Sequence, residues 1–295
     1  MKHLTKEALL AALQEYKGLI PVSILVREEQ LLWLDMEGYH FYEGFFHKTL
    51  DLFHALKKGR VTSFITDVAV LEDKAVLTDY LYPDGFIFHA GRCGSTTLAK
   101  ALARPQENLV ISEARPHNSV WKVLTHDGEE PLTMSERNKA IYRHLILAMA
   151  RRRRAAHRRF FIKFSSFNIR FFDFIHSVFP DVPALFLERD LAAILHSWRN
   201  SPPGWLEQDH PKALKMLTGS DVPDLEQIIK YFLEKAAGYP DSQLKHVDYT
   251  MLKAENLPLI LSYLHYGPEP AALALMQTQL AYDSKVELNR KKFNA

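Results

Sequence analysis

The sequence has little of several features that mark particular classes of protein. Its 295 residues include one cysteine, Cys93, which excludes an internal disulfide framework and a cysteine-based zinc cluster. No apolar run approaches the roughly 20 residues that a membrane-spanning helix needs. The first residues also lack the basic and then apolar pattern of a secretion signal. We therefore expect a cytoplasmic protein in a reducing compartment, without a membrane partner.

Neither sign of charge is in excess. There are 37 Lys and Arg against 35 Asp and Glu, which gives a net charge of +2. This balance argues against a surface devoted to nucleic acid, but not against a local site for an anion. Hydrophobic residues make up 47% of the chain and charged residues 24%, as in ordinary globular proteins.

From residue 85 onward, apolar runs of strand length alternate with helical patterns. The predicted strands are 85–90, 109–111, 160–164, 184–187 and 244–247, and the predicted helices are 96–103, 135–157, 167–179, 191–198 and 225–237. This alternation predicts an α/β fold, with a parallel sheet flanked by helices. Residues 1–80 instead predict an α+β extension packed on a main domain of residues 81–295. Ligands of such sheets bind beyond the carboxyl ends of the strands.

The first predicted strand of the main domain runs into the loop Gly91-Arg-Cys-Gly-Ser-Thr-Thr-Leu98. Glycines let backbone N–H groups turn toward an anion, and a helix N-terminus adds unpaired donors and a positive dipole end. Arg92 and the hydroxyls of Ser95 and Thr96 add further donors. A Walker A motif is excluded because no lysine precedes Ser95. The alternative interpretation is a plain strand–helix turn with Ser95 as the N-cap.

This loop resembles the 5′-phosphosulfate-binding loop of the P-loop sulfotransferases, here in a bacterial-type variant. Cys93 stands where the family usually has serine, and Ser95 where it has its first threonine. A later segment is similar to the family's 3′-phosphate clamp, because Arg189 ends a predicted strand and Ser197 follows it on a predicted helix. The resemblance covers roughly residues 85–265. It implies a P-loop nucleotide-binding fold and transfer of a sulfuryl group from 3′-phosphoadenosine-5′-phosphosulfate to a hydroxyl or amine, without a metal, leaving adenosine 3′,5′-bisphosphate.

The same resemblance suggests roles for single residues. It implies that the 5′ end of the donor is bound by Arg92, Cys93, Gly94, Ser95 and Thr96, and the 3′-phosphate by Arg189 and Ser197. Glu113 is placed like the glutamate base of the tyrosylprotein sulfotransferase branch. Lys163, at the end of a predicted strand, is the expected cation near the transferred group.

Other interpretations of these residues stay open. Glu113 pairs with Arg115 in one alternative, and His117 or His89 is the base in another. For His89 we favour packing within the first strand, with its imidazole bonded to a neighbouring backbone group. For Cys93 we favour a small buried filler over a redox switch, although a helix N-terminus lowers the pKa of a thiol.

The run Arg151–Arg154 is the strongest basic cluster. We expect it to be the solvated C-terminus of the predicted helix 135–157, because cations there complement the helix dipole. Two alternative functions remain: a P-loop nucleotide or small-molecule kinase, and a non-catalytic anion- or RNA-binding module that uses the arginine run. The expected partner is a small-molecule or peptide acceptor rather than nucleic acid. The sequence does not reveal the acceptor, and it leaves a homo-oligomer open.

Overall fold

The structure, a computed structural model, describes residues 2–126, 130–208 and 224–293, and the side chains of all of these except residues 207–208 and 283–293. The chain forms two compact units that alternate along the sequence. The first unit consists of Met1–Pro83, Gln106–Ile162 and Phe174–Asp181, and the second of Asp84–Pro105, Lys163–Asp173 and Val182–Ala295. The predicted boundary at residue 80 stays a prediction.

The first unit contains a four-stranded sheet of order β1-β4-β3-β2. The hairpin of β2 and β3 is antiparallel, β3 and β4 are antiparallel, and β1 is parallel to β4. The strands are β1 (Lys2–His3), β2 (Leu19–Leu25), β3 (Gln30–Asp35) and β4 (Ser63–Asp67). The helices of this unit are α1 (Lys6–Glu15), α2 (Phe46–Leu56), α4 (Arg115–Leu124) and α5 (Glu136–Met149). Helices α4 and α5 both pack on β2.

The predicted parallel sheet is confirmed, with the order β6-β7-β5-β8-β9 and all strands parallel. Its strands are β5 (Gly85–His89), β6 (Asn108–Ser112), β7 (Arg159–Lys163), β8 (Ala184–Glu188) and β9 (Lys245–Asp248). Each lies within a residue or two of a predicted strand. Apolar runs without alternation gave these positions because strands of a parallel sheet are covered on both faces.

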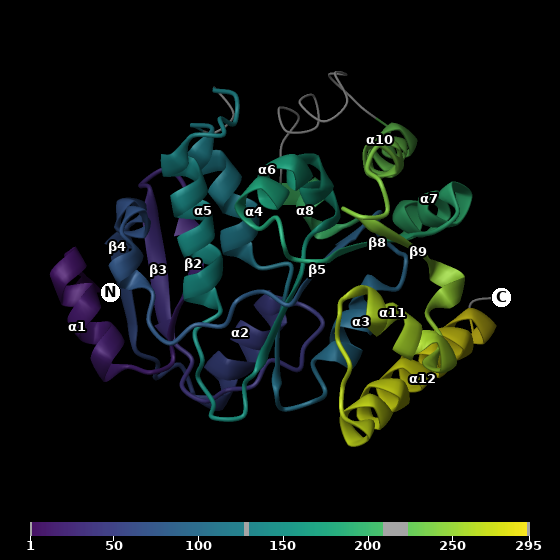
Figure 1. The fold of residues 1–295 in the computed structure, drawn as a ribbon, viewed down its shortest axis with the longest axis horizontal. Helices are drawn as coiled ribbons and strands as arrows, with labels where there is room; N and C mark the ends of the chain where they lie inside the picture. Colours follow the sequence, from purple (N-terminus) through teal and green to yellow (C-terminus); the bar gives the residue numbers. More distant parts are fainter. Residues whose placement is uncertain (1, 127–129, 209–223, 294–295) are drawn as a thin grey trace. The chain divides into compact units, whose positions relative to one another are not determined.

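The second unit builds its helices around β5, β8 and β9. They are α3 (Ser95–Leu102), α7 (Leu191–Asn200), α8 (Gly204–Gln208), α10 (Leu225–Ala237), α11 (Leu257–Tyr263) and α12 (Pro270–Phe293). Figure 1 shows α7 and α10 on one side of β8 and β9, and α3 and α12 on the other. Helix α3 packs on α12, and α7 packs on α10. The loop after β5, the residue after β8 and the turn after β9 therefore share one edge of the sheet.

Within the described ranges, none of the helices combines the length and the apolarity that a membrane crossing requires. The shorter elements η1 (Val68–Glu72), η2 (Lys74–Val76), η3 (Ser166–Phe171), η4 (Tyr249–Met251) and η5 (Ala254–Asn256) are turns of 3₁₀-helix. Helix α6 (Phe172–Val178) continues η3.

The expectation of a solvated arginine run is wrong. Helix α5 ends at Met149, so the run lies beyond the helix, and Arg151 and Arg153 are only 4% and 8% exposed. The guanidinium of Arg153 lies over the ring of Phe41, 4.0 Å from its centroid. Arginine tolerates such burial because its planar group stacks on aromatic faces.

Arg151 is buried because it binds the backbone of the N-terminal elements. Its guanidinium donates to the carbonyl oxygens of Leu13, of Tyr16 at 2.8 Å and of Leu19 at 3.3 Å. Leu13 and Tyr16 lie at the C-terminus of α1, where carbonyls lack helical partners and a cation is favoured. One side chain therefore joins α1, the start of β2 and the segment after α5 within the first unit.

Candidate functional site: an anion loop at the end of β5

The chain turns sharply between β5 and α3. Gly91, Arg92 and Gly94 have positive φ angles of 90°, 52° and 79°. Gly94 occupies the N-cap position of α3 and offers no side-chain hydrogen bond to the helix. Ser95 is the first helical residue, so the alternative in which Ser95 is the N-cap is wrong. The N-cap residue therefore contributes no side chain to the N–H groups of the first turn, and a glycine turn into a helix N-terminus is an arrangement that binds anions.

Neighbouring side chains leave no room for anything larger than glycine in this loop. A Cβ atom at Gly91 would lie 2.8 Å from Cζ2 of Trp198, on α7. A Cβ atom at Gly94 would overlap Cδ1 of Leu252 and lie 3.3 Å from the ring of Tyr249. Both positive φ angles are also costly for other residues. Glycine is therefore required at both positions for conformation and for space.

The predicted cation at the end of β7 lies against this loop. The side chain of Lys163 is completely buried, with 0% of its surface exposed. Its Nζ atom donates to Oγ1 of Thr96, in the first turn of α3, over 3.3 Å. An ammonium group removed from water is stabilised by nearby negative charge. The positive charge of Lys163 and the N-terminus of α3 therefore favour the same occupant, an anion.

Cys93 is buried at the centre of the loop. Burial raises the pKa of its thiol to about 11, although the positive charge of Lys163 acts in the opposite direction. At neutral pH this thiol is protonated and shielded from solvent, which does not fit a redox switch. The position agrees with a small filler residue.

Arg189 connects the second predicted anion site to the loop. Its guanidinium lies over the ring of Tyr249, 4.4 Å from the centroid, and its Nη1 donates to the carbonyl oxygen of Arg92 over 3.2 Å. The side chain of Arg92 donates from Nη2 to the carbonyl and to Oγ of Ser201, the latter over 2.8 Å. Ser197 is half-buried on α7 in the same unit, and its phosphate contact stays a prediction.

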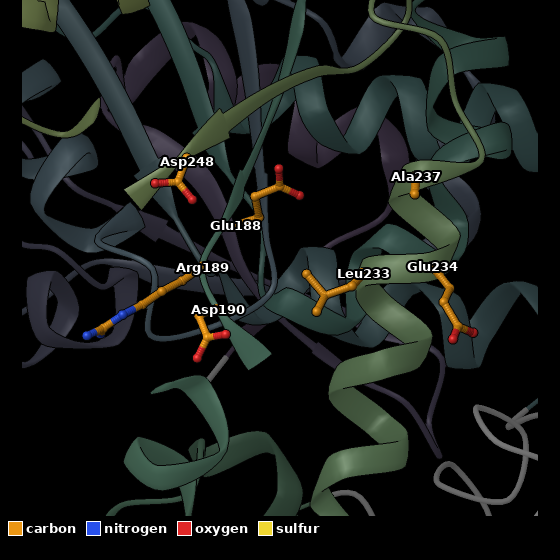
Figure 2. Close-up of a pocket in the computed structure, with 7 residues that line it drawn as sticks. All are labelled: Glu188, Arg189, Asp190, Leu233, Glu234, Ala237 and Asp248. Carbon is orange, nitrogen blue, oxygen red and sulfur yellow. The ribbon is translucent and has the colours of Figure 1, made fainter. Parts of the chain in front are cut away.

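Arg189 also lines a pocket of about 440 Å³. Figure 2 shows Arg189 extending away from α10, whose Leu233 and Glu234 form the opposite wall. The lining residues are Glu188, Arg189, Asp190, Leu233, Glu234, Ala237 and Asp248. Four of these seven are acidic, so this pocket does not have the charge of an anion site.

Three of the acidic groups in the pocket have local structural roles. Asp190 accepts a hydrogen bond from a backbone N–H in the first turn of α7, as its N-cap. Asp248 accepts from the backbone N–H of Thr250 over 2.8 Å. Glu188 pairs with the ring of His246, with Oε2 3.0 Å from Nδ1. Three of the four acidic side chains are therefore explained by helix capping, turn capping and one hydrogen bond to a histidine ring.

The candidate base, Glu113, belongs to the first unit. It follows β6 directly, is half-buried and has a φ of 51°. A positive φ is rare for glutamate and is a form of backbone strain found at functional sites. The structure thus joins the loop, Lys163 and Arg189 in one unit, and Glu113 as base stays a prediction.

The two alternative bases differ in their surroundings. His117 lies on the buried face of α4 with 0% exposure, and burial lowers its pKa to about 3. A ring with so low a proton affinity is a poor general base at neutral pH. His89 accepts a hydrogen bond at Nδ1 from the backbone N–H of Gly91 over 3.0 Å. The prediction that its imidazole bonds a neighbouring backbone group is confirmed.

Several residues around the loop were missed by sequence reasoning. Trp198, Ser201, Tyr249 and Leu252 are the residues that hold the loop in place. They are far from it in sequence, and only a three-dimensional structure could associate them with it. Among the side chains that the structure describes, no group of three or more His, Cys, Asp or Glu is placed to hold a metal ion.

Comparison with known proteins adds no assignment. No protein-family model matches the chain, and no curated protein matches it at a significant level.

Proposed function

We propose that this chain is a sulfotransferase, which moves a sulfuryl group from 3′-phosphoadenosine-5′-phosphosulfate to a hydroxyl or amine acceptor. The observation that carries the proposal is the convergence of three features in the second unit. These are a helix N-terminus after a glycine loop, a fully buried Lys163 bonded to that helix, and Arg189 bonded to the loop backbone. A donor with two separate phosphate groups needs two such cationic sites.

At the 5′ end, the N–H groups after Gly91 and the hydroxyls of Ser95 and Thr96 bind the phosphosulfate oxygens. Lys163 neutralises negative charge that builds up on the leaving phosphate oxygen as the sulfur–oxygen bond breaks. A fixed cation in a site closed to water is effective in this role because it needs no reorganisation during the reaction. The buried position of Lys163 supports this assignment.

At the 3′ end, Arg189 and Ser197 bind the extra phosphate of the donor. The stacking of Arg189 on Tyr249 fixes the plane of the guanidinium, and a fixed plane favours bidentate binding of a phosphate. The remaining N–H groups of Arg189 are then directed at the ligand, while Nη1 also contacts the loop carbonyl of Arg92.

The acceptor attacks the sulfur atom in line with the leaving phosphate oxygen. Its hydroxyl or amine proton passes to the carboxylate of Glu113, a new bond forms between the acceptor and sulfur, and adenosine 3′,5′-bisphosphate leaves with the electron pair of the broken bond. This role of Glu113 rests on the resemblance to the tyrosylprotein branch, and its strained backbone supports it.

Calorimetric titration with adenosine 3′,5′-bisphosphate, adenosine 5′-monophosphate and ATP with Mg²⁺ tests the proposal. We expect the bisphosphate to bind most tightly. Arg189→Ala should weaken the bisphosphate by about 10- to 100-fold, the effect of one charge-assisted hydrogen-bonding group, and leave the monophosphate unchanged. Arg199→Ala, an exposed arginine on the same helix as Ser197, is the matched control. Preferred binding of ATP with Mg²⁺ would instead support a kinase.

Turnover tests the base separately. Glu113→Gln keeps the shape of the side chain but removes its proton affinity, so we expect unchanged bisphosphate binding and loss of sulfuryl transfer in an acceptor screen. Wild-type turnover in this variant would remove Glu113 from the mechanism and leave the donor site intact.

A further inference from the structure

We infer that His89 is a positioning residue for the anion loop: by accepting the N–H of Gly91 at Nδ1, it sets the first turn of the loop and so aims the following amides at the ligand. The inference rests on the proposed function of this loop as an anion site. In this inference His89 contributes to donor binding through the loop backbone, without touching the proposed donor or the acceptor.

The geometry of the contact supports this role. His89 is the last residue of β5 and is only 5% exposed, and its Nδ1 lies 3.0 Å from the amide nitrogen of Gly91, two residues later. A side chain that binds the backbone two residues ahead forms a tight local turn of the kind that asparagine and aspartate make. Here an imidazole makes this turn at the point where the strand must end and the loop begin.

The contact also decides which amides are free for a ligand. The N–H of Gly91 donates to Nδ1 of His89, so this amide is not among those that can bind an anion. Gly91 has a φ of 90° and its Cα faces the ring of Trp198. The turn is therefore held by the hydrogen bond that Gly91 donates to His89 and by packing against Trp198. Loss of the hydrogen bond leaves the packing and, one residue later, the contact of Arg189 with the carbonyl of Arg92.

The chemistry of the ring makes the role specific. Nδ1 accepts a hydrogen bond only when it carries no proton, so the ring must be neutral with its proton on Nε2. Asparagine places Oδ1 near the position of Nδ1 and keeps the acceptor. Leucine fills similar space without an acceptor. Glutamine has an amide oxygen, but its side chain is one bond longer, so this oxygen does not coincide with the position of Nδ1.

The test compares His89→Asn, His89→Leu and His89→Gln by calorimetric titration with inorganic sulfate, a probe of the loop alone, and with adenosine 3′,5′-bisphosphate. We expect His89→Asn to bind both within about 2-fold of the wild type. His89→Leu and His89→Gln should lose about 10-fold, which is ~1.4 kcal/mol, the scale of a backbone N–H that loses its partner. Exchange of the Gly91 amide hydrogen, followed by NMR, should be slow in the wild type and His89→Asn and faster in the other two variants.

The outcomes separate the inference from the proposed function. If the wild type binds sulfate but not the bisphosphate, the donor assignment fails, and the sulfate series still tests His89. If His89→Leu binds sulfate as the wild type does, or if His89→Asn loses as much as His89→Leu, the positioning role is overturned. Should His89→Leu not fold, His89→Gln against His89→Asn gives the same comparison with two polar side chains.

Discussion

Two buried histidines of the first unit should make the protein sensitive to mild acid. His117 and His157 are both 0% exposed, and burial lowers the pKa of each from 6.5 to about 3. The nearby positive charge of Arg153 lowers the pKa of His157 further in the same direction. Between pH 6.5 and pH 3 the unfolded chain therefore binds protons on these rings while the folded protein does not. Stability is fully present above pH 6.5 and is lost as the pH falls through this range.

The size of the effect follows from the two shifts. Inside this range each histidine reduces the free energy of unfolding by about 1.4 kcal/mol for each pH unit. Together, the two rings lower the free energy of unfolding by about 4 kcal/mol between pH 7 and pH 5. Domains are typically stable by about 5–15 kcal/mol, so this loss is a large fraction of the total.

Urea unfolding followed by circular dichroism, at half-unit steps from pH 4 to pH 7, measures this slope. His117→Leu and His157→Leu should each reduce the slope between pH 4 and pH 6 by about 1.4 kcal/mol per pH unit, whatever each replacement costs at neutral pH. His54→Leu, which removes an exposed imidazole, is the matched control. If both variants keep the slope of the wild type, the two rings take up protons equally in the folded and unfolded states, and the reasoning is refuted.

Three further outcomes test the packing described above. Arg151→Met removes a donor from the carbonyl groups of Leu13, Tyr16 and Leu19 and should destabilise the protein by about 3 kcal/mol in urea. Arg154→Met should cost far less, and equal effects would contradict the role of Arg151 in joining α1, β2 and the segment after α5. Gly94→Ala should cost about 1–3 kcal/mol more than Gly59→Ala, because both positions have positive φ but only Gly94 also meets packed side chains. The buried thiol of Cys93 should resist iodoacetamide at neutral pH until the chain is unfolded in urea, and rapid alkylation of the native protein would disprove its burial.

The parallel sheet could be predicted from the sequence because its strands are continuous apolar runs followed directly by polar residues. The glycine loop was also readable, since Gly91 and Gly94 occur next to hydroxyl residues at a helix start. Lys163 and Arg189 could be placed near it because both lie at the carboxyl ends of predicted strands of one sheet. Each of these inferences used residues that are neighbours in the chain.

Packing between residues far apart in the chain could not be predicted from the sequence. No helix was predicted between residues 103 and 135, but α4 covers Arg115–Leu124 and buries His117 and Trp121. The arginine run was assigned to solvent because nothing local showed that α1 presents carbonyl groups to Arg151. The segment 199–222, between two predicted helices, lies partly outside the described residues.

The interleaving of the two units has a consequence for how the protein is made. Residues Asp84–Pro105 of the second unit are synthesised before Gln106–Ile162 of the first, and the first is not complete until Asp181. On the ribosome, all segments of the first unit have been made once Asp181 is reached, whereas the second unit still lacks its long last segment, Val182–Ala295. The contact between Arg151 and Leu13 joins residues 138 positions apart and forms late in synthesis of the first unit. No single proteolytic cut can therefore release an intact half, and dissecting the protein into working parts would require rejoining the chain in a new order.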